Sequence, residues 1–358
     1  MPDYSQYQGP SAEWETFVEK NPLPAGNFTI PPQTIRQNTN ALRIKLAQTE
    51  LAAESLHDAV HWRDHCILTR DNQNILARIY TPKSNPNQVS SSETPLPVYL
   101  YFHGGGHLFG TIETEDAACS RLAAHANLIV VNVNYRHTPE FTHPTQVNDA
   151  WDALIWLSRN AALLNANPNR VIVGGISAGA GLAASVVLQH HTMCRHGKDS
   201  VPLTVLGQLL CIPWLVHPDN YQLSTQAGSS YAQNVDAPVL SKTLLRLFTD
   251  LLGAADPSDP TLNVGLVGDG GVVGLPKSAF LVAGRDLLRD EGLDYAEKLT
   301  ENEVPTKVHV FPGLPHGFRR FSALASSRVW DELLVESCQW ILSESQASSF
   351  DVVDTNNV

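Results

Sequence analysis

Residues 171–191 of this 358-residue chain read VIVGGISAGAGLAASVVLQHH, and this stretch decides the fold class. An apolar run, Val171–Gly175, precedes a serine between two glycines, and a run of small and apolar residues, Ala178–His191, follows it. A strand, a sharp turn and a helix in this order present the hydroxyl of Ser177 at the turn, with the helix dipole directed at any charge that develops there. An ordinary glycine-rich turn is the alternative, but the strand–turn–helix context favours a nucleophile.

The same rhythm of strand and helix continues on both sides of this stretch. Cys66–Arg70 and Asn74–Thr81 predict a hairpin around Asp71-Asn72, and a polar loop is predicted at Pro82–Pro97. Beyond it, the predicted strands are Val98–Phe102, Leu128–Asn134, Thr204–Ile212, Ala279–Ala283 and Lys307–Phe311, and the predicted helices are Glu115–Ala126, Val147–Asn160, Asp290–Asn302 and a segment after His316 through about Leu342. Apolar strands that alternate with helices are typical of a mostly parallel sheet covered on both faces, so the fold class is α/β.

Two segments depart from this rhythm. The first is polar up to Pro31-Pro32, and a helix is predicted from about Thr34 to His57. The second, Trp214–Pro276, is rich in Gly, Pro, Ser and Asp, contains one clear helix at Lys242–Leu252, and is long enough to form a lid. The expected organisation is an N-terminal cap segment at 1–60, a catalytic core at 61–213 and 277–345, a cap insertion at 214–276 and a flexible C-terminal tail at 346–358.

The composition excludes several classes of protein. The chain has 36 acidic and 24 basic residues, a formal charge of −12, and no basic run that would bind a phosphate backbone, so nucleic acid is not expected as a partner. No apolar stretch approaches the ~18–20 residues of a membrane span. The sequence also lacks a basic amphipathic helix, so stable membrane association is not expected. The first residues lack a signal-peptide pattern and the 5 cysteines are scattered, so we expect a cytoplasmic protein without metal or cofactor. A homodimer is left open.

A second motif, His103-Gly104-Gly105-Gly106, directly follows a predicted strand. Consecutive glycines allow backbone amides to turn toward a ligand oxygen, and acyl transfer needs such donors because its tetrahedral intermediate carries negative charge on oxygen. We therefore predict that the N–H groups of Gly105, Gly106 and Ala178 form an oxyanion hole. A plain glycine loop or a weak phosphate cradle is the alternative, although the Lys and Ser/Thr of a P-loop are missing.

A serine nucleophile needs a base, and the base needs an acid that fixes its tautomer. Among 14 histidines, His316 follows the last predicted strand of the core, and Asp286 follows the strand before it. Both are therefore expected at the same edge of the sheet as Ser177, the carboxyl ends of the strands, where the sites of α/β proteins form. The chain order Ser177, Asp286, His316 fits a nucleophile on a strand–turn–helix. The rival acids Asp290 and Glu291 fall in the first turn of a predicted helix, where the helix dipole accounts for them.

With these residues assembled, the chain from about Tyr80 to Leu342 resembles a hormone-sensitive-lipase-like α/β hydrolase. The resemblance rests on five ordered motifs: His103–Gly106, Tyr135-Arg136 with Pro139-Glu140, Gly175–Gly179, Asp286–Gly292 and His316-Gly317-Phe318. It implies a triad of serine, aspartate and histidine. It also implies a cap built from the N-terminal segment and from the insertion before the acid, and this matches the two segments that depart from the rhythm.

The chain differs from the common pattern of that family beside the expected site. Members commonly carry Asp or Thr where this chain has Ile176, and an aromatic or aliphatic residue where it has His107. These two residues adjoin the nucleophile and the oxyanion loop, so we expect them to influence the substrate. With them, three aromatic residues of the insertion, Trp214, Tyr221 and Phe248, are predicted as substrate contacts in a pocket between cap and sheet.

The leading hypothesis is a serine hydrolase that cleaves a carboxylic ester of a neutral or apolar small molecule through an acyl-enzyme. A second hypothesis keeps the site and changes the outcome: if the cap excludes water, the same residues cyclise, condense or cleave a C–C bond in a biosynthetic intermediate of secondary metabolism. A third is a ligand-binding module, as in the plant hormone receptor of the family, which has lost the histidine. The presence of Ser177, Asp286 and His316 together disfavours it.

Overall fold

The computed structural model describes residues 3–23, 26, 28–83, 94–197, 201–226 and 228–356, so most of the predicted loop at 82–97 lies outside it. The described residues form a nine-stranded sheet in the order β1-β2-β4-β3-β5-β6-β7-β8-β9. β2 runs antiparallel to both of its neighbours, and every pair from β4 to β9 is parallel. The strands are β1 Val60–Leu68, β2 Asn74–Pro82, β3 Leu96–Phe102, β4 Ile129–Asn134, β5 Ala166–Ile176, β6 Val205–Cys211, β7 Lys277–Arg285, β8 Thr306–Pro315 and β9 Ser349–Val352.

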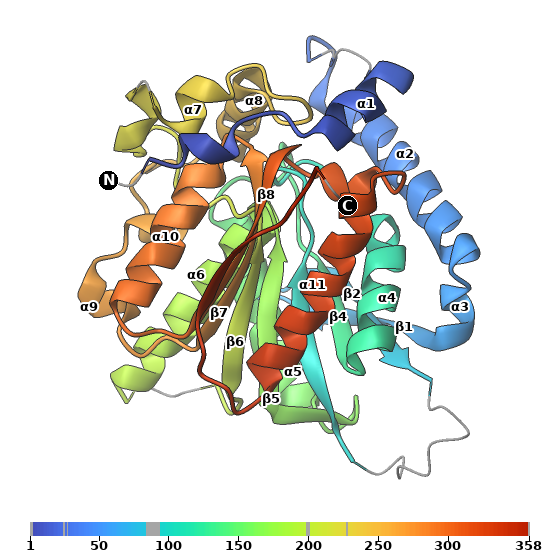
Figure 1. Ribbon diagram of the computed structural model, residues 1–358. Helices are drawn as coiled ribbons and strands as arrows, with labels where there is room; N and C mark the ends of the chain where they lie inside the picture. The colour runs from blue at the N-terminus through green and yellow to red at the C-terminus, as the bar shows by residue number, and fades with distance from the viewer. Residues whose placement is uncertain are drawn as a thin grey trace.

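Helices cover both faces of this sheet (Figure 1). α4 and α11 pack together on one face, while α5, α6 and α10 cover the other. The helices are α1 Ala12–Lys20, α2 Pro32–Ala53, α3 Leu56–Ala59, α4 Asp116–Ala126, α5 Thr145–Asn160, α6 Ala178–Arg195, α7 Ser230–Gln233, α8 Lys242–Leu252, α9 Asp269–Val272, α10 Arg289–Glu301 and α11 Ala325–Leu342. The predicted hairpin, the strand–helix alternation and the helix at 242–252 are therefore confirmed.

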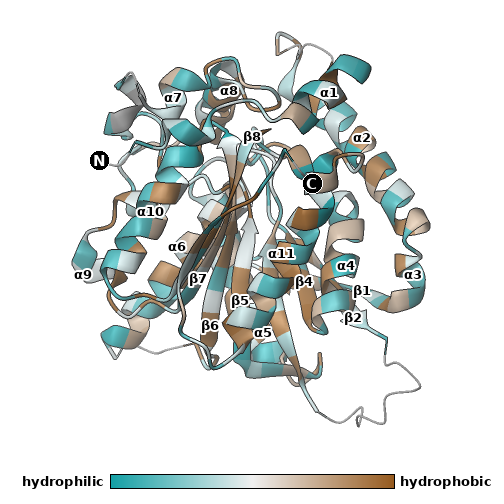
Figure 2. Cartoon of the chain, in the orientation of Figure 1, coloured by the Kyte–Doolittle hydropathy of each residue, from teal (hydrophilic) through white to brown (hydrophobic). Residues whose placement is uncertain are grey.

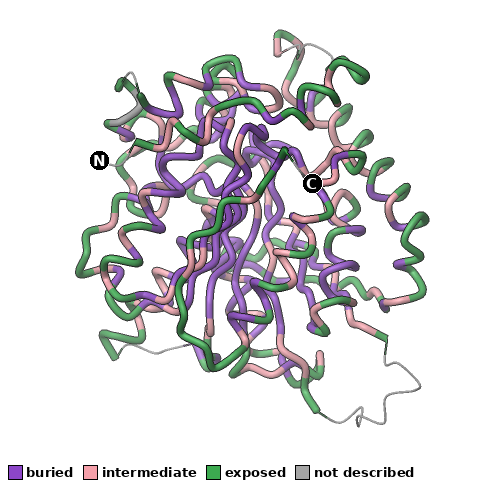
Figure 3. Tube along the Cα trace, viewed as in Figure 1, coloured by how far each residue is buried: buried purple, intermediate pink, exposed green. Residues whose placement is uncertain are grey.

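The sheet separates two hydrophobic cores. In β3 the side chains of Val98, Leu100 and Phe102 join the core under α5 and α6, whereas Tyr99 joins the core under α4 and α11. This alternation follows from the two-residue period of a strand. The central strands are hydrophobic and buried along their length, and the outer helix faces are polar (Figures 2 and 3). Burial on both faces explains why these strands are apolar throughout.

The chain near its C-terminus differs from the expectation. A flexible tail was predicted at 346–358, but β9 within it pairs in parallel with β8, from Lys307 opposite Ser349 to Val310 opposite Val352. β9 covers the backbone groups that β8 would otherwise expose at the sheet edge, which is the physical reason for its order. The predicted helix after His316 is also divided, into a short 3₁₀ turn at Phe318–Arg320 and α11.

The two segments that depart from the strand–helix rhythm lie together above the carboxyl ends of the parallel strands. The N-terminal segment contributes α1 and α2, and the insertion contributes α7 and α8 (Figure 1). Ser11 is the N-cap of α1, and its hydroxyl accepts the N–H of Trp14 at 3.0 Å. Ser241 is the N-cap of α8 and accepts the N–H of Leu244 in the same way. Trp14 is buried against Phe321, so the N-terminal segment is anchored on the core.

Candidate active site

Ser177 occupies a sharp turn between β5 and α6. Its backbone adopts φ 57° and ψ −121°, an uncommon conformation for a residue with a side chain. Its N–H donates to the carbonyl of Cys211 at 2.8 Å, which ties the turn to the neighbouring strand β6. A Cβ on Gly179 would lie 2.1 Å from the Phe102 carbonyl oxygen, so only glycine permits the close crossing of α6 over β3. The turn thus fixes the Ser177 hydroxyl above the sheet.

His316 connects the serine to a buried carboxylate. His316 Nε2 lies 2.9 Å from Ser177 Oγ, and His316 Nδ1 lies 2.7 Å from Asp286 Oδ2. The carboxylate has no proton to give, so Nδ1 carries the proton of that bond and Nε2 is left to accept from the serine hydroxyl. Asp286 is 1% exposed, His316 6% and Ser177 7%. The three predicted side chains therefore form one continuous hydrogen-bonded chain.

Parallel strands place the acid and the base at the same edge. Asp286 follows β7 directly and His316 follows β8 directly, and these strands are neighbours in the sheet. A second oxygen of Asp286, Oδ1, accepts the N–H of Leu288 at 3.0 Å, which fixes the carboxylate plane. The rival acids have other partners: Asp290 accepts the N–H of Ser230, and Glu291 accepts the N–H of Leu215, both at 2.6 Å. They hold the insertion to α10.

The glycine loop after β3 lies against Ser177. An ideal Cβ on Gly104 would be 3.4 Å from Ser177 Cβ, and Gly105 and Gly106 adopt φ values of 137° and 60° that favour glycine. His103 stabilises the loop: its ring stacks on Tyr135 at 4.5 Å, and its carbonyl accepts the Tyr135 hydroxyl at 2.8 Å. Ala178, the first residue of α6, directly follows the serine.

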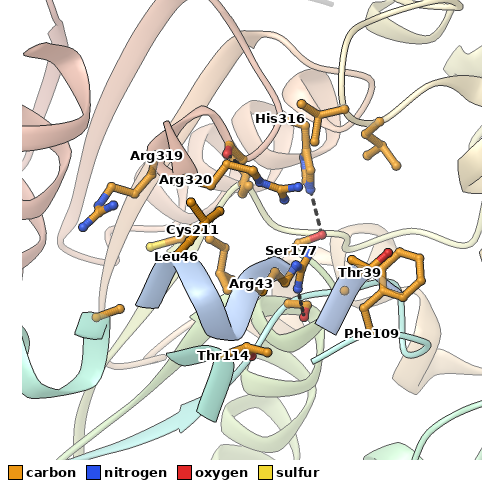
Figure 4. Close-up of a pocket in the computed structure, with 18 of the residues that line it drawn as sticks. Thr39, Arg43, Leu46, Phe109, Thr114, Ser177, Cys211, His316, Arg319 and Arg320 are labelled. Carbon is orange, nitrogen blue, oxygen red and sulfur yellow. Dashed lines mark hydrogen bonds between the residues drawn. The ribbon is translucent and has the colours of Figure 1, made fainter. Parts of the chain in front are cut away.

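A cavity of about 870 Å³ opens in front of Ser177, between the cap and the sheet (Figure 4). Both cap segments contribute to its wall, together with the glycine loop and the residues after β8. Its apolar lining includes Trp14, Leu42, Leu46, Phe109, Leu244 and Phe248. Such a mostly apolar cavity with a few polar groups at one end is typical of a small-molecule site.

The predicted substrate contacts divide into two groups. Ile176 and Phe248 line the cavity, and the Phe248 ring packs against the glycine loop. His107, Trp214 and Tyr221 do not line it, and their prediction is corrected. Trp214 is buried behind the turn, with its indole N–H on the Val216 carbonyl, and the Tyr221 hydroxyl donates to Asp294.

His107 lies with Trp214 in a second, much smaller cavity behind Ala178. His107 adopts a positive φ of 59°, and burial lowers the pKa of its imidazole to about 3. The imidazole is therefore neutral and supports the loop from behind.

Two arginines of the cavity wall were not predicted. Arg43 lies on α2 between the cavity residues Leu42 and Leu46, and Arg320 follows His316 by four residues. The sequence does place Arg43 beside the apolar positions of a predicted cap helix, and it places Arg320 close to the expected base. Neither signal shows from the sequence alone that the side chains turn inward.

The described residues contain no group of three or more His, Cys, Asp or Glu side chains arranged to hold a metal ion. No helix among these residues is both long and apolar enough to cross a membrane. All 5 cysteines are free.

This fold, with a serine on a strand–turn–helix, an aspartate after β7 and a histidine after β8, defines the class of α/β hydrolases. The family described as alpha/beta hydrolase fold matches residues 99–320 of this chain. The chain belongs to this family.

Three relatives illustrate its place there. Esterase LipI of Mycobacterium tuberculosis is 34% identical over 242 residues, which are 67% of this chain and 70% of the relative. The versiconal hemiacetal acetate esterase of Dothistroma septosporum is 27% identical and matches 73% of this chain and 78% of its own length. The crystal structure of vibralactone cyclase is similar with a TM-score of 0.83 at 27% identity, over 95% of this chain and 96% of that one.

Proposed function

We propose that this protein is a carboxylic ester hydrolase with Ser177 as the nucleophile. The observation that carries the proposal is the continuous hydrogen-bonded chain Ser177–His316–Asp286 at the floor of a largely apolar cavity. An esterase among the relatives, LipI, shares the family and supports the reaction class. The substrate is a small molecule, because the cavity of about 870 Å³ has the size of a drug-sized ligand site.

In the proposed reaction His316 Nε2 takes the Ser177 proton while Oγ attacks the ester carbonyl. Asp286 stabilises the imidazolium through the Nδ1–H bond and stays ionised. The N–H groups of Gly105, Gly106 and Ala178 stabilise the oxyanion of the tetrahedral intermediate. His316 then protonates the leaving alcohol, and an acyl group stays on Ser177. A water molecule, deprotonated by His316, releases the carboxylic acid by the same steps in reverse.

The proposal is tested by the hydrolysis of 4-nitrophenyl butyrate. Ser177→Ala removes the nucleophile and is expected to lower kcat by at least about a thousandfold. Ser185→Ala is the matched control, since Ser185 is a buried serine of α6, the helix that follows Ser177, and does not line the cavity. Full activity of Ser177→Ala, or equal losses in the two variants, would contradict the assignment.

A second candidate is a biosynthetic enzyme that uses the same residues for cyclisation. The similarity to vibralactone cyclase favours it, because that match covers 95% of this chain and thus includes both cap segments. In such an enzyme a hydroxyl or carbon nucleophile of the substrate takes the place of water at the acyl group. Stoichiometric acylation of Ser177 by 4-nitrophenyl butyrate without turnover would favour this candidate over the hydrolase.

We also propose a cytoplasmic location. The free state of all 5 cysteines supports a reducing compartment. Imaging of the chain fused to a fluorescent protein would test this, and a secreted or organellar signal would contradict it.

A further inference from the structure

Three arginines of the cavity lining, Arg43, Arg285 and Arg320, have no ion-pair partner among the described residues, and two of them lie beside the reacting residues. Arg121 and Arg319, close to the same wall, are both paired with Glu50 and Asp331. Arg43 and Arg320 differ: among the described residues neither has an acidic side chain within ion-pair distance, and each is held by a carbonyl oxygen instead. A charged side chain turned into a mostly apolar cavity with no counter-charge is costly, so it requires an explanation.

Both groups are anchored beside the reacting residues. Arg43 Nη1 donates to the Gly104 carbonyl at 3.2 Å, and Arg320 Nε donates to the Gly317 carbonyl at 3.2 Å. A Cβ on Gly104 would lie 3.4 Å from Ser177 Cβ, so this residue is beside the serine, and Gly317 is the residue after His316. Figure 4 shows the two side chains directed toward the space beside Ser177 and His316. Each carbonyl occupies one N–H of its guanidinium, and the remaining N–H groups are available for a ligand.

The directions of the pKa shifts agree with the lack of an ion-pair partner for Arg43 and Arg320. Burial, and then repulsion from Arg43, lowers the pKa of Arg320, and burial lowers the pKa of Arg43. Glu115 is the carboxylate whose charge acts on both guanidinium groups, and its two oxygens already accept the hydroxyls of Tyr101 and Thr114. Two cations against one anion leave a single positive charge. That charge matches one carboxylate better than a phosphate dianion.

We propose that Arg43 and Arg320 bind a carboxylate of the substrate, so that the ester cleaved at Ser177 carries an acidic group a few bonds from its reacting carbonyl. This inference rests on the proposed ester hydrolysis and narrows its substrate class. A guanidinium group binds a carboxylate through two parallel hydrogen bonds, and such charge-assisted bonds are strong where water is excluded. The apolar lining, with Leu42, Leu46 and Phe248, then holds the hydrocarbon part of the same molecule.

The net charge of −12 does not oppose this proposal. A negative protein slows the encounter with an anion, but exposed charges are screened beyond about 8–10 Å at physiological ionic strength. Besides the charged groups already named, the cavity lining contains Arg285 and Asp236, and neither of them acts on the pKa of Arg43 or Arg320. Selectivity for the carboxylate is therefore determined within the cavity.

The test compares two esters of equal length. Mono-4-nitrophenyl glutarate carries a free carboxylate, and methyl 4-nitrophenyl glutarate is its neutral counterpart. The wild-type kcat/KM is expected to favour the anionic ester by tenfold or more. Arg43→Met and Arg320→Met are each expected to reduce this preference at least tenfold, and Arg320→Lys to retain part of it.

Arg328→Met is the matched control, because Arg328 is exposed on α11, with a side chain 76% accessible. Equal kcat/KM values for the two esters in the wild type would overturn the proposal.

A binding measurement separates this proposal from the proposed function. In the Ser177→Ala variant, monomethyl glutarate is expected to raise the melting temperature and dimethyl glutarate is not. The double variant Ser177→Ala with Arg320→Met should lose this shift, and the melting temperature without ligand shows whether that variant folds. Selective stabilisation by the monoester supports the carboxylate site even if the wild type hydrolyses neither ester. Equal stabilisation by both compounds overturns it even if the protein proves to be an esterase.

Discussion

Replacement of Gly106 by alanine tests how closely the cap is seated on the oxyanion loop. A Cβ at this position would lie 2.2 Å from Cδ2 of Phe248 on α8, about 1.2 Å closer than the 3.4 Å at which ordinary contacts begin. Gly106 also has φ 60°, where an L side chain costs ~1–2 kcal/mol. Overpacking of this size adds ~1–3 kcal/mol, so the loop or the ring must move. If the loop moves, the N–H groups of Gly105 and Gly106 are displaced from the serine.

The expected result is a kcat/KM for 4-nitrophenyl butyrate about 10²–10³ lower in Gly106→Ala, the effect of losing one oxyanion donor. Because much of the clash is with one ring, the added variant Phe248→Ala should recover about tenfold, and backbone strain should leave the recovery incomplete. Gly197→Ala is the matched control: it has the same φ of 60° with nothing within 4 Å of its Cβ, and should keep the wild-type kcat/KM.

The assay is a double-mutant cycle in kcat/KM, with melting temperatures recorded for each variant. The reasoning is refuted if the two losses multiply without coupling, because Phe248 would then not press on the loop. It is also refuted if Gly106→Ala has wild-type activity. A displaced loop would then still support catalysis, although the oxyanion role requires its N–H groups to keep their positions.

Further predictions concern the acid, a buried carboxylate and the C-terminal strand. Asp286→Asn cannot hold the His316 tautomer and should lower kcat about 10³–10⁴-fold, measured with 4-nitrophenyl butyrate; a loss below tenfold would contradict its role. Burial raises the pKa of Asp294 to about 6, so its stabilising protonated form is lost as pH rises from about 4 through 6. Asp294→Asn keeps an acceptor for Tyr221 and should therefore gain ~1–2 kcal/mol at pH 8, after discounting for partial exposure, and nothing at pH 4; equal melting shifts at both pH values would contradict this. Truncation after Gln346 removes β9 and should lower the melting temperature by several degrees, whereas an unchanged value would indicate a flexible tail.

The sequence predicts the core of the fold well because its signals are local. The strand, turn and helix of residues 171–191 each follow from a few neighbouring residues, and the same holds for the glycine loop after β3. Because the strands are parallel, their carboxyl ends meet at one edge of the sheet. Ser177, Asp286 and His316 can therefore be placed at that edge from the order of the strands, without information on distant contacts. In the structure the three side chains are linked by hydrogen bonds of 2.7 and 2.9 Å.

The features that the sequence did not predict depend on tertiary contacts. β9 has only four residues, and it is ordered because β8 offers it an edge. Trp214 and Tyr221 are aromatic residues of the insertion, but their polar atoms find partners behind the site, so they turn away from the cavity. Arg43 on α2 and Arg320 in the 3₁₀ turn after β8 would be solvated charges if each segment stood alone, and the packing of the cap on the core encloses them. Side-chain direction in such a cap is set by distant neighbours.

The central claim is that His316 activates Ser177 as a nucleophile, and covalent labelling tests it most directly. A fluorophosphonate transfers its phosphonyl group to an activated serine oxygen and releases fluoride. Peptide mass spectrometry should find one phosphonyl group per chain, on Ser177, with labelling abolished in Ser177→Ala and slowed at least a hundredfold in His316→Ala. Absence of the label from Ser177 in the wild type, or equal labelling rates in the wild type and His316→Ala, would contradict the account.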